Sequence, residues 1–268
     1  MTACVGFVAG TKGSLAGIDL VLLLHTLLGT AFVASGTSAF NQVWEAELDA
    51  RMARTARRPL PSGAISRGGA AAFAGLLSVV GLAELWSFTD PVTTALAAFT
   101  LVSYVLVYTP MKTRSAASTI VGAVPGALPP LGGFTAAAGG TIGLPGLALF
   151  AILFVWQIPH FFAIGWRHRA DYAKAGVVIL PVVDPSGRAT ARQTLLWTAV
   201  LLPISLLPSL VGTAGFAYAF GAFVLTLLFL ATSLRFAREV SDGRARSLFL
   251  ASIAWLPAVL ALLVVDRV

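Results

Sequence analysis

Long runs of apolar residues, separated by short polar breaks, constrain the fold of this chain more than any other feature. Only 11% of its 268 residues are Asp, Glu, Lys or Arg, whereas a soluble domain has about 25%. Mean hydropathy is +0.88. A water-soluble fold of this size cannot bury so much apolar surface, so the bilayer must be the solvent. Because the runs are unbroken rather than alternately apolar and polar, they predict membrane-spanning helices and exclude barrel strands.

A helix needs roughly 20 apolar residues to cross a bilayer. Eight runs meet this requirement, and they cover residues 18–40, 67–88, 91–109, 117–139, 144–166, 192–212, 214–234 and 247–265. Residues 1–10 read as the end of a further helix that is truncated at its start. We therefore predict an all-α membrane protein, a bundle of about eight to nine transmembrane helices, in one polytopic domain over residues 1–268.

The basic residues predict the orientation of the chain. Sixteen of its 18 Lys and Arg residues lie in four loops, which follow spans 18–40, 91–109, 144–166 and 214–234. The intervening loops contain only Lys12. Since loops rich in Lys and Arg stay on the inner side, this alternation predicts a multi-pass protein of the cell inner (plasma) membrane with the four basic loops cytoplasmic. The net charge of +7 is thus a topology signal, and we expect no nucleic-acid partner.

Three oxygen-bearing side chains follow the first span. Asn41, Glu45 and Asp49 are spaced at i, i+4 and i+8, so a helix places them on one face within about 80°. Glu47 points away and is expected to be solvated. Such a row at the membrane surface suffers desolvation and mutual repulsion unless a cation binds. Mg²⁺ prefers carboxylate oxygens together with substrate phosphate oxygens and waters.

Basic side chains come directly after this row. Arg51, Arg54, Arg57 and Arg58 follow within nine residues of Asp49, and Arg is suited to bidentate phosphate contacts. A diphosphate bridged by a cation would fit between the two groups. The alternative reading is an amphipathic helix end with solvated charges and arginines that serve only topology.

The second large loop, after span 144–166, carries further candidates. Pro159 breaks or kinks the helix and can re-aim His160, which would contact a substrate or a haem iron, or else be satisfied by a backbone carbonyl. Asp171, Tyr172 and Lys174 stand where a second half of the bundle would present its own phosphate ligands. Asp171 is also compatible with simple solvation.

Two tyrosines near the inner end of span 91–109 are a further candidate feature. Tyr104 and Tyr108 are spaced i, i+4 and precede Lys112. Aromatic residues are common at membrane interfaces, and rings at this depth would also shield a carbocation by cation–π contact. Both interpretations of Tyr108 stay open from the sequence.

The motifs resemble those of the protohaem IX farnesyltransferases, a branch of the UbiA-type intramembrane prenyltransferases. The signature in residues 41–63 is N-Q-x-x-E-x-x-x-D-x-x-M-x-R-T-x-x-R-P-L-P-S-G. Residues 108–134 and 159–183 match in the same order, and the similarity extends over residues 1–210. The chain departs from the pattern at Ala170, where an acidic residue usually precedes Asp171, and at Ser118, where Asn is frequent. It also lacks the usual Lys-Pro-Arg entry to the first helix.

The resemblance implies a UbiA-type prenyltransferase fold and the transfer of farnesyl from farnesyl diphosphate to a vinyl group of haem b, a substrate rather than a cofactor. Haem o and diphosphate would be the products, and a haem a synthase would be a candidate partner. The residues it assigns to Mg²⁺ are Asn41, Glu45 and Asp49, with Asp171 at a second cation. The residues it assigns to the diphosphate are Arg54, Arg58, Lys112 and Lys174. Tyr108, His160 and Tyr172 are further candidates.

Two other functions remain compatible with the same sequence. One is prenylation of a quinone precursor or another aromatic acceptor by the same type of enzyme. The other is a non-catalytic membrane protein that binds or carries haem. The first would accept a small aromatic ring such as 4-hydroxybenzoate, and the second would release no diphosphate.

Overall fold

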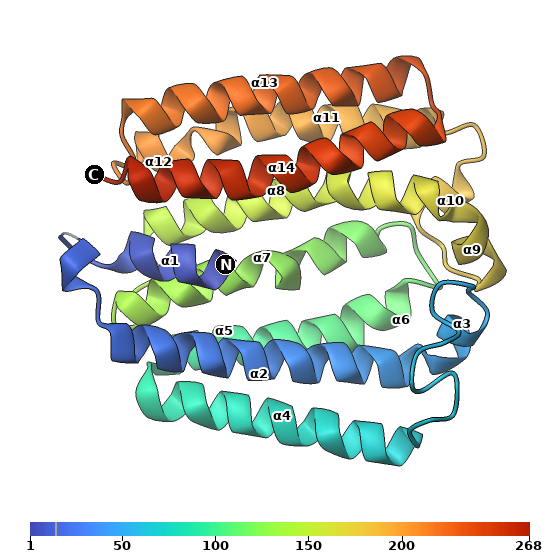
Figure 1. Cartoon of the computed structure of the whole chain (residues 1–268), viewed down its shortest axis with the longest axis horizontal. Helices are drawn as coiled ribbons and strands as arrows, with labels where there is room; N and C mark the ends of the chain where they lie inside the picture. Colours follow the sequence, from blue (N-terminus) through green and yellow to red (C-terminus); the bar gives the residue numbers. More distant parts are fainter. Residues whose placement is uncertain (14) are drawn as a thin grey trace.

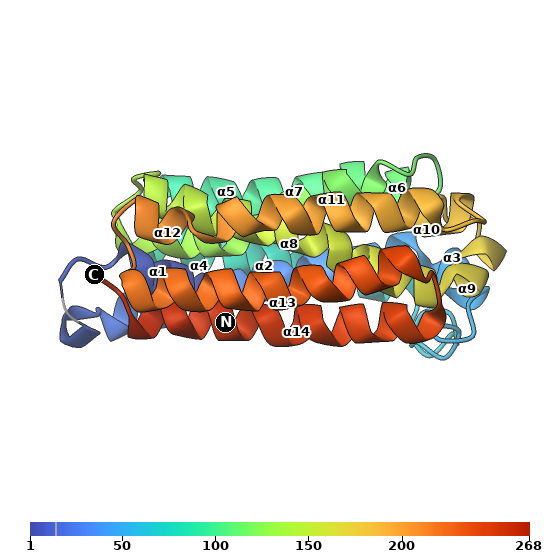
Figure 2. The same ribbon diagram turned by 90° about the horizontal axis from the view of Figure 1, so that it is seen from above.

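The computed structural model describes residues 1–13 and 15–268, and its long helices run side by side along one axis (Figures 1 and 2). The elements of the first half are α1 (Thr2–Gly10), the 3₁₀ turn η1 (Leu15–Gly17), α2 (Leu20–Trp44), α3 (Ala46–Ala50), α4 (Arg67–Phe88), α5 (Pro91–Val102), the π-helix η2 (Ser103–Tyr108), α6 (Thr109–Met111) and α7 (Ser118–Ala137).

The second half begins with the central helix α8. Its elements are α8 (Leu144–Arg167), α9 (Arg169–Lys174), α10 (Leu180–Val183), α11 (Arg188–Ser205), α12 (Leu207–Leu210), α13 (Phe216–Arg238) and α14 (Asp242–Val265). Helices α8, α11, α13 and α14 pack together, while α2, α4, α5 and α7 form the other group, and α7 lies against α8 between them (Figure 1).

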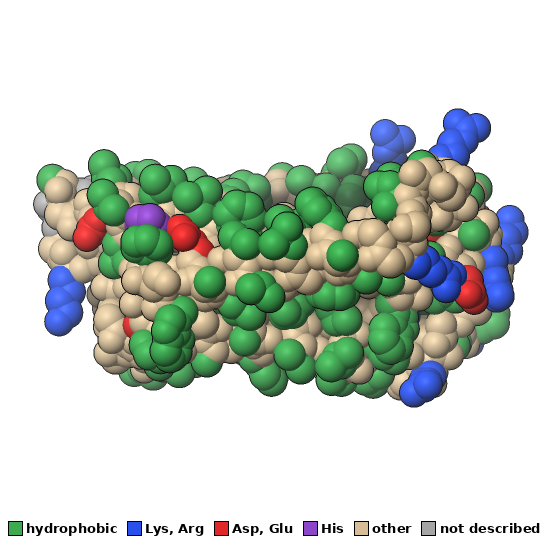
Figure 3. All heavy atoms as spheres, turned by 90° about the horizontal axis from the view of Figure 1, so that it is seen from below, with side chains coloured by type: hydrophobic (Ala, Val, Ile, Leu, Met, Phe, Trp, Pro, Cys, Tyr) green, Lys and Arg blue, Asp and Glu red, His purple; other side chains and the backbone are tan. Residues whose placement is uncertain are grey.

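The part of the chain that the structure describes contains eight helices long and apolar enough to cross a membrane, which confirms the predicted number. They are Leu20–Trp44, Arg67–Phe88, Pro91–Met111, Ser118–Ala137, Leu144–Arg167, Arg188–Leu210, Phe216–Arg238 and Asp242–Val265. Apolar side chains cover the middle of the molecule, and Lys and Arg gather mainly at the end that carries α3 and α9 (Figure 3). This distribution is that of a multi-pass membrane protein.

Short side chains allow the central helices to approach closely. A Cβ built on Gly6 of α1 would overlap the backbone carbonyl of Pro130, and one on Gly133 of α7 would overlap that of Ala3. Close packing of small residues replaces the hydrophobic effect between helices in a bilayer. As a result α7 and α8 are the two most buried spans, each more than half buried.

Polar caps fix several helix starts at the membrane surface. Ser66 Oγ accepts a hydrogen bond from the Gly69 N–H at 3.1 Å at the start of α4, and Asp90 Oδ1 accepts one from the Thr93 N–H at 2.8 Å at the start of α5. Each cap satisfies an N–H group that has no partner within its helix. The spans α4 and α5 therefore begin at defined residues.

Candidate functional site

A cavity of about 400 Å³ lies at the end of the bundle that carries α3 and α9. Its walls come from the end of α2 and α3, from η2 and α6, and from α7 and α8. A wider hollow of about 790 Å³ near Lys12 and Arg267, at the opposite end, contains none of the residues predicted for the site. The smaller cavity is therefore the candidate site.

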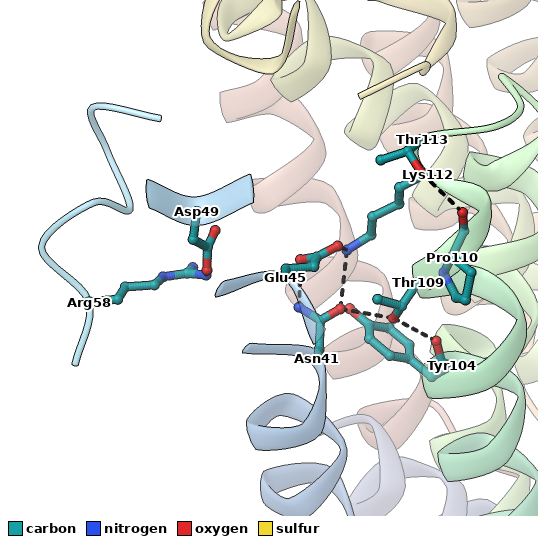
Figure 4. A network of polar contacts seen from close by, with 9 residues as sticks. All are labelled: Asn41, Glu45, Asp49, Arg58, Tyr104, Thr109, Pro110, Lys112 and Thr113. Carbon is teal, nitrogen blue, oxygen red and sulfur yellow. Dashed lines mark hydrogen bonds and ion pairs between the residues drawn. The ribbon is translucent and has the colours of Figure 1, made fainter. Parts of the chain in front are cut away.

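One wall of the cavity is a network of polar side chains from α2 and from the end of α6 (Figure 4). Asn41 Nδ2 donates to Glu45 Oε2 at 2.8 Å, and Lys112 Nζ lies 2.7 Å from Glu45 Oε1. Asn41 Oδ1 accepts hydrogen bonds from Lys112 Nζ at 3.2 Å and from Thr109 Oγ1 at 3.0 Å. Glu45 is only 8% exposed. The predicted face of α2 is thus tied to a span more than 60 residues away in the sequence.

The π-helix η2 shapes the opposite side of this network. Across its wider turn the Tyr104 carbonyl accepts a hydrogen bond from the Thr109 N–H, and it accepts a second one from Thr109 Oγ1 at 2.8 Å. The Tyr104 and Tyr108 rings meet edge to face at 4.8 Å, and Lys112 Nζ lies 4.6 Å from the Tyr108 ring centroid. Single π-helical turns often occur at functional sites, and here the turn brings two rings and an ammonium group to one wall.

Asp49 and the arginines after it form the outer wall. Arg58 Nη1 donates to Asp49 Oδ2 at 2.7 Å, and the Asp49 residue is 1% exposed. Thr55 Oγ1 donates to the backbone carbonyl of Asp49 at 2.9 Å, which fixes the turn between them. Arg54 also lines the cavity. A buried carboxylate is therefore paired with one guanidinium group, and a second guanidinium group lines the same cavity.

Two glycines of α7 make room on the inner, membrane side. A Cβ on Gly122 would overlap the Tyr108 ring, and a Cβ on Gly126 would overlap the side-chain amide of Gln157. Gln157 and Phe161, spaced i, i+4 on α8, line the same region. The cavity thus changes from charged groups near α3 to aromatic and apolar groups between α7 and α8.

The donor set fits Mg²⁺ that is shared with a substrate. Glu45, Asp49 and the amide of Asn41 all line the cavity and carry the hard oxygen atoms that Mg²⁺ prefers. Among residues 1–13 and 15–268 no group of three or more His, Cys, Asp or Glu side chains is arranged to hold a metal. Mg²⁺ is usually held by one or two carboxylates together with waters and substrate phosphates rather than by a protein cage, so the two observations agree.

The loops around the cavity carry a positive local field. Burial, and then the charges of Arg54 and Arg167, lower the pKa of His168 below its ordinary value, while Asp171 opposes the shift. His168 follows the last residue of α8, outside the membrane span. Its ring meets that of Tyr172 edge to face at 6.4 Å. An anion entering here would encounter excess positive charge.

The cavity brings together most of the residues predicted from the sequence. Those that line it are Asn41, Glu45, Asp49, Arg54, Arg58, Tyr108, Lys112 and Tyr172. Asp171 and Lys174 lie outside its lining, with Lys174 Nζ 3.8 Å from Asp171 Oδ1. His160 also lies outside, where its Nδ1 is 2.7 Å from Ser252 Oγ on α14. Glu47 is solvated as expected, with its side chain 73% exposed beside Arg67.

Three polar residues of the site were not predicted from the sequence. Thr109 joins the Asn41 network, while Thr119 and Gln157 line the membrane side of the cavity. Gln157 could have been identified from the sequence, because an amide in the middle of an apolar run must find hydrogen-bond partners within the protein. Thr109 could not, since threonine is common near the ends of spans.

The eight candidate spans among the described residues, and a cavity in which carboxylates lie beside Arg and Lys, define a polytopic membrane protein with a charged site at one end. Residues 1–256 match the UbiA prenyltransferase family. The chain belongs to this family and is a membrane prenyltransferase.

Relatives with similar sequences extend over nearly the whole chain. A protein of Solibacter usitatus named protoheme IX farnesyltransferase is 49% identical over 94% of this chain and 86% of its own length. A protein of Koribacter versatilis with the same name is 44% identical over 100% of this chain and 88% of its own length.

Solved structures share the fold at low sequence identity. A structure described in connection with digeranylgeranylglyceryl phosphate synthase has a TM-score of 0.82 at 19% identity, covering 99% of this chain and 91% of that chain. A UbiA homologue from Archaeoglobus fulgidus bound to GPP and Mg²⁺ has a TM-score of 0.64 at 16% identity, covering 98% of this chain and 93% of its own. These similarities confirm the UbiA-type fold.

Proposed function

We propose that this prenyltransferase moves a farnesyl group from farnesyl diphosphate to a vinyl group of protohaem IX, giving haem o and diphosphate. The observation that carries the proposal is the cavity wall of Asn41, Glu45 and Asp49 facing Arg54, Arg58 and Lys112. The relatives named protoheme IX farnesyltransferase support the choice of donor and acceptor.

Different residues along the cavity have different proposed roles in binding the diphosphate and the cation. Arg54, Arg58 and Lys112 bind the diphosphate oxygens and stabilise the charge that develops as the allylic C–O bond breaks. Asn41, Glu45 and Asp49 would hold Mg²⁺, which would supply Lewis-acid stabilisation of the leaving diphosphate. Asp171 and Lys174 lie on α9 outside the cavity lining and are proposed to add to the binding of cation and diphosphate from there. His160 lies outside the cavity lining, with its Nδ1 2.7 Å from Ser252 Oγ on α14, and is proposed to orient haem b from there.

Aromatic rings and apolar surface serve the organic part of the substrates. The Tyr104 and Tyr108 rings flank Lys112, so they face the region where the allylic cation forms. Cation–π contact stabilises such a charge without offering a nucleophile. Tyr172 lines the outer part of the same cavity. The farnesyl tail would extend from the charged end of the cavity into its apolar part beside Phe161 and Ile164.

The basic loops indicate which side of the membrane the cavity faces. Because Lys and Arg gather at the end that holds the cavity, we place that end on the cytoplasmic side of the plasma membrane. Farnesyl diphosphate would then enter from the cytoplasm and haem b from the bilayer. A haem a synthase that consumes haem o is the proposed partner, and we propose residues 1–268 as one functional domain.

A product analysis tests the proposal. The purified protein in lipid nanodiscs receives farnesyl diphosphate and Mg²⁺, with haem b in one reaction and 4-hydroxybenzoate in another. We expect a farnesylated haem in the first reaction and no prenylated product in the second. Prenylated 4-hydroxybenzoate with unchanged haem would overturn the proposed acceptor, and binding of haem without diphosphate release would overturn the proposed enzyme.

A further inference from the structure

The side chain of Gln157 is a polar group on the membrane side of the cavity, in the middle of α8. It lies ten residues before the end of this helix at Arg167, so the helical rise places it about 15 Å inside that end. The residue is only 6% exposed. Its neighbours on the cavity wall, Phe161 and Ile164, are apolar, and a buried polar group in such a place requires a physical reason.

The orientation of the amide follows from its hydrogen bonds. Gln157 Nε2 donates to the carbonyl of Leu153 at 3.1 Å and to that of Ala123 at 3.5 Å. Only the NH₂ end of an amide can donate to a carbonyl, so the oxygen end is fixed as well. Gln157 Oε1 lies over Gly126, where a Cβ would overlap it. Within residues 1–13 and 15–268 no hydrogen bond to this oxygen is found.

The structure therefore presents a pre-oriented hydrogen-bond acceptor to the part of the cavity where a prenyl group would react. An acceptor needs a donor, and the two organic substrates of the proposed reaction provide none. Diphosphate and ionised propionates only accept hydrogen bonds, and vinyl, methyl and prenyl groups do neither. Water is the one reactant with an O–H group.

We propose that Gln157 Oε1 holds the water molecule that completes the hydroxyalkyl side chain. This inference rests on the proposed function. The allylic C–O bond breaks and its electron pair leaves with the diphosphate. The terminal vinyl carbon bonds to the farnesyl carbon, which leaves positive charge on the other vinyl carbon. The water oxygen bonds to that carbon, and its proton passes to the released diphosphate.

A competing outcome makes the role of the water measurable. The same cation can lose a proton from the adjacent carbon and give an alkene that is lighter than the alcohol by one water molecule. A held water favours the alcohol because it is already in place when the cation forms. The ratio of alcohol to alkene therefore reports on the water alone and is unaffected by how much enzyme is folded.

The experiment compares Gln157→Met with Gln193→Met in the full-length protein with Mg²⁺, farnesyl diphosphate and haem b. Methionine has a similar volume and no acceptor oxygen, so packing is largely kept. Gln193 lies on α11 and does not line the cavity. We expect the alcohol-to-alkene ratio to fall about ten-fold in Gln157→Met, the factor that one hydrogen bond supplies, and to stay at the wild-type value in Gln193→Met.

Each result decides the inference. An unchanged ratio in Gln157→Met, with product still formed, would overturn it while leaving the proposed function intact. A folded Gln157→Met protein that forms neither product would overturn it too, because Gln157 would then act before water adds. If Gln157→Met does not fold, Gln157→Glu is measured instead. This variant retains an acceptor oxygen, so it should still form mainly the alcohol. A product of Gln157→Glu that is mainly the alkene would contradict the inference. Wild-type protein without any farnesylated haem would overturn the proposed function and this inference together.

Discussion

Lys112 Nζ lies 2.7 Å from Glu45 Oε1, and both side chains are largely buried, at 16% and 10% exposure. The pair joins the inner end of α2 to the end of α6. It holds a carboxylate in the cavity and places an ammonium group beside it for an incoming anion. Removal of one partner leaves the other charge buried and unpaired. This lowers the stability of the protein by more than the intact pair adds to it.

Lys112→Met is therefore expected to lower the free energy of unfolding by about 3 kcal/mol, since Glu45 remains buried without its partner. Combining it with Glu45→Gln should recover most of the stability but none of the diphosphate release. Thermal unfolding in detergent and a diphosphate-release assay measure the two effects separately. Equal stability of the single and double variants would show that the pair is not coupled in the way we describe.

Mg²⁺ removal should stop diphosphate release without unfolding the protein, because Glu45 and Asp49 are already paired with Lys112 and Arg58 in the structure. Addition of EDTA should abolish turnover, and excess Mg²⁺ should restore it. The thermal midpoint measured without substrate should change little. Full turnover in EDTA would contradict the assignment of these side chains to a cation.

Gly126→Ala should narrow the cavity, since its Cβ would overlap the amide of Gln157. We expect a loss of stability of about 1–3 kcal/mol from overpacking and reduced activity. Gly132→Ala on the same helix is the matched control, because a Cβ there meets no atom within 4 Å. Helix propensity favours alanine equally in both variants, so a drop shared by the two would argue against the steric explanation.

Asp184 provides a stability prediction that depends on pH. Burial alone would raise the pKa of Asp184, but hydrogen bonds from Thr190 and Ser186 outweigh it and lower that pKa below its ordinary value of 3.8. Its Oδ2 accepts from the Thr190 N–H at 2.8 Å and caps the start of α11. A lowered pKa means that the ionised form stabilises the fold. This contribution is complete above pH 3.8 and is lost as the pH falls through the folded-state pKa.

Asp184→Ala should therefore cost about 1 kcal/mol at neutral pH, as for other helix caps. The difference from wild type should shrink once the pH falls below the ordinary range of aspartate. Thermal unfolding measured across this pH range in detergent provides the comparison. A difference that stays constant down to the most acidic sample would show that the carboxylate charge plays no part.

The spans could be predicted because each is a continuous apolar run that lipid requires to be helical. Their ends were harder to place. The sixth span was expected at 192–212, but α11 begins at Arg188, directly after Gly187 in the left-handed conformation, and Asp184 accepts a hydrogen bond from the Thr190 N–H in its first turn. The seventh was expected to end at 234, yet α13 continues to Arg238, since a helix need not stop where the lipid does.

The grouping of Asn41, Glu45 and Asp49 was predictable from their spacing, but the single helix face expected for them was wrong, because α2 ends at Trp44 and Asp49 lies on α3 beyond the break at Glu45. The partners of this group were not predictable, since Lys112 and Thr109 come from another span and reach it only through packing. Pro110 indicates a distorted helix near η2, because proline lacks an N–H and its ring clashes with the carbonyl four residues earlier, but it does not specify a π turn. The role of Asp171 stays a prediction, because this residue lies outside the cavity lining.

The most direct test of the account is the mass of the porphyrin recovered after incubating haem b, Mg²⁺ and farnesyl diphosphate with wild type, Asp49→Ala and Glu47→Ala. Asp49 is buried in the cavity, whereas the side chain of Glu47, two residues away, is 73% exposed. We predict haem o from wild type and from Glu47→Ala. Asp49→Ala should remain inserted and folded and yield only unchanged haem b. Haem o formed by Asp49→Ala at the wild-type rate would contradict the assignment of this cavity as the active site.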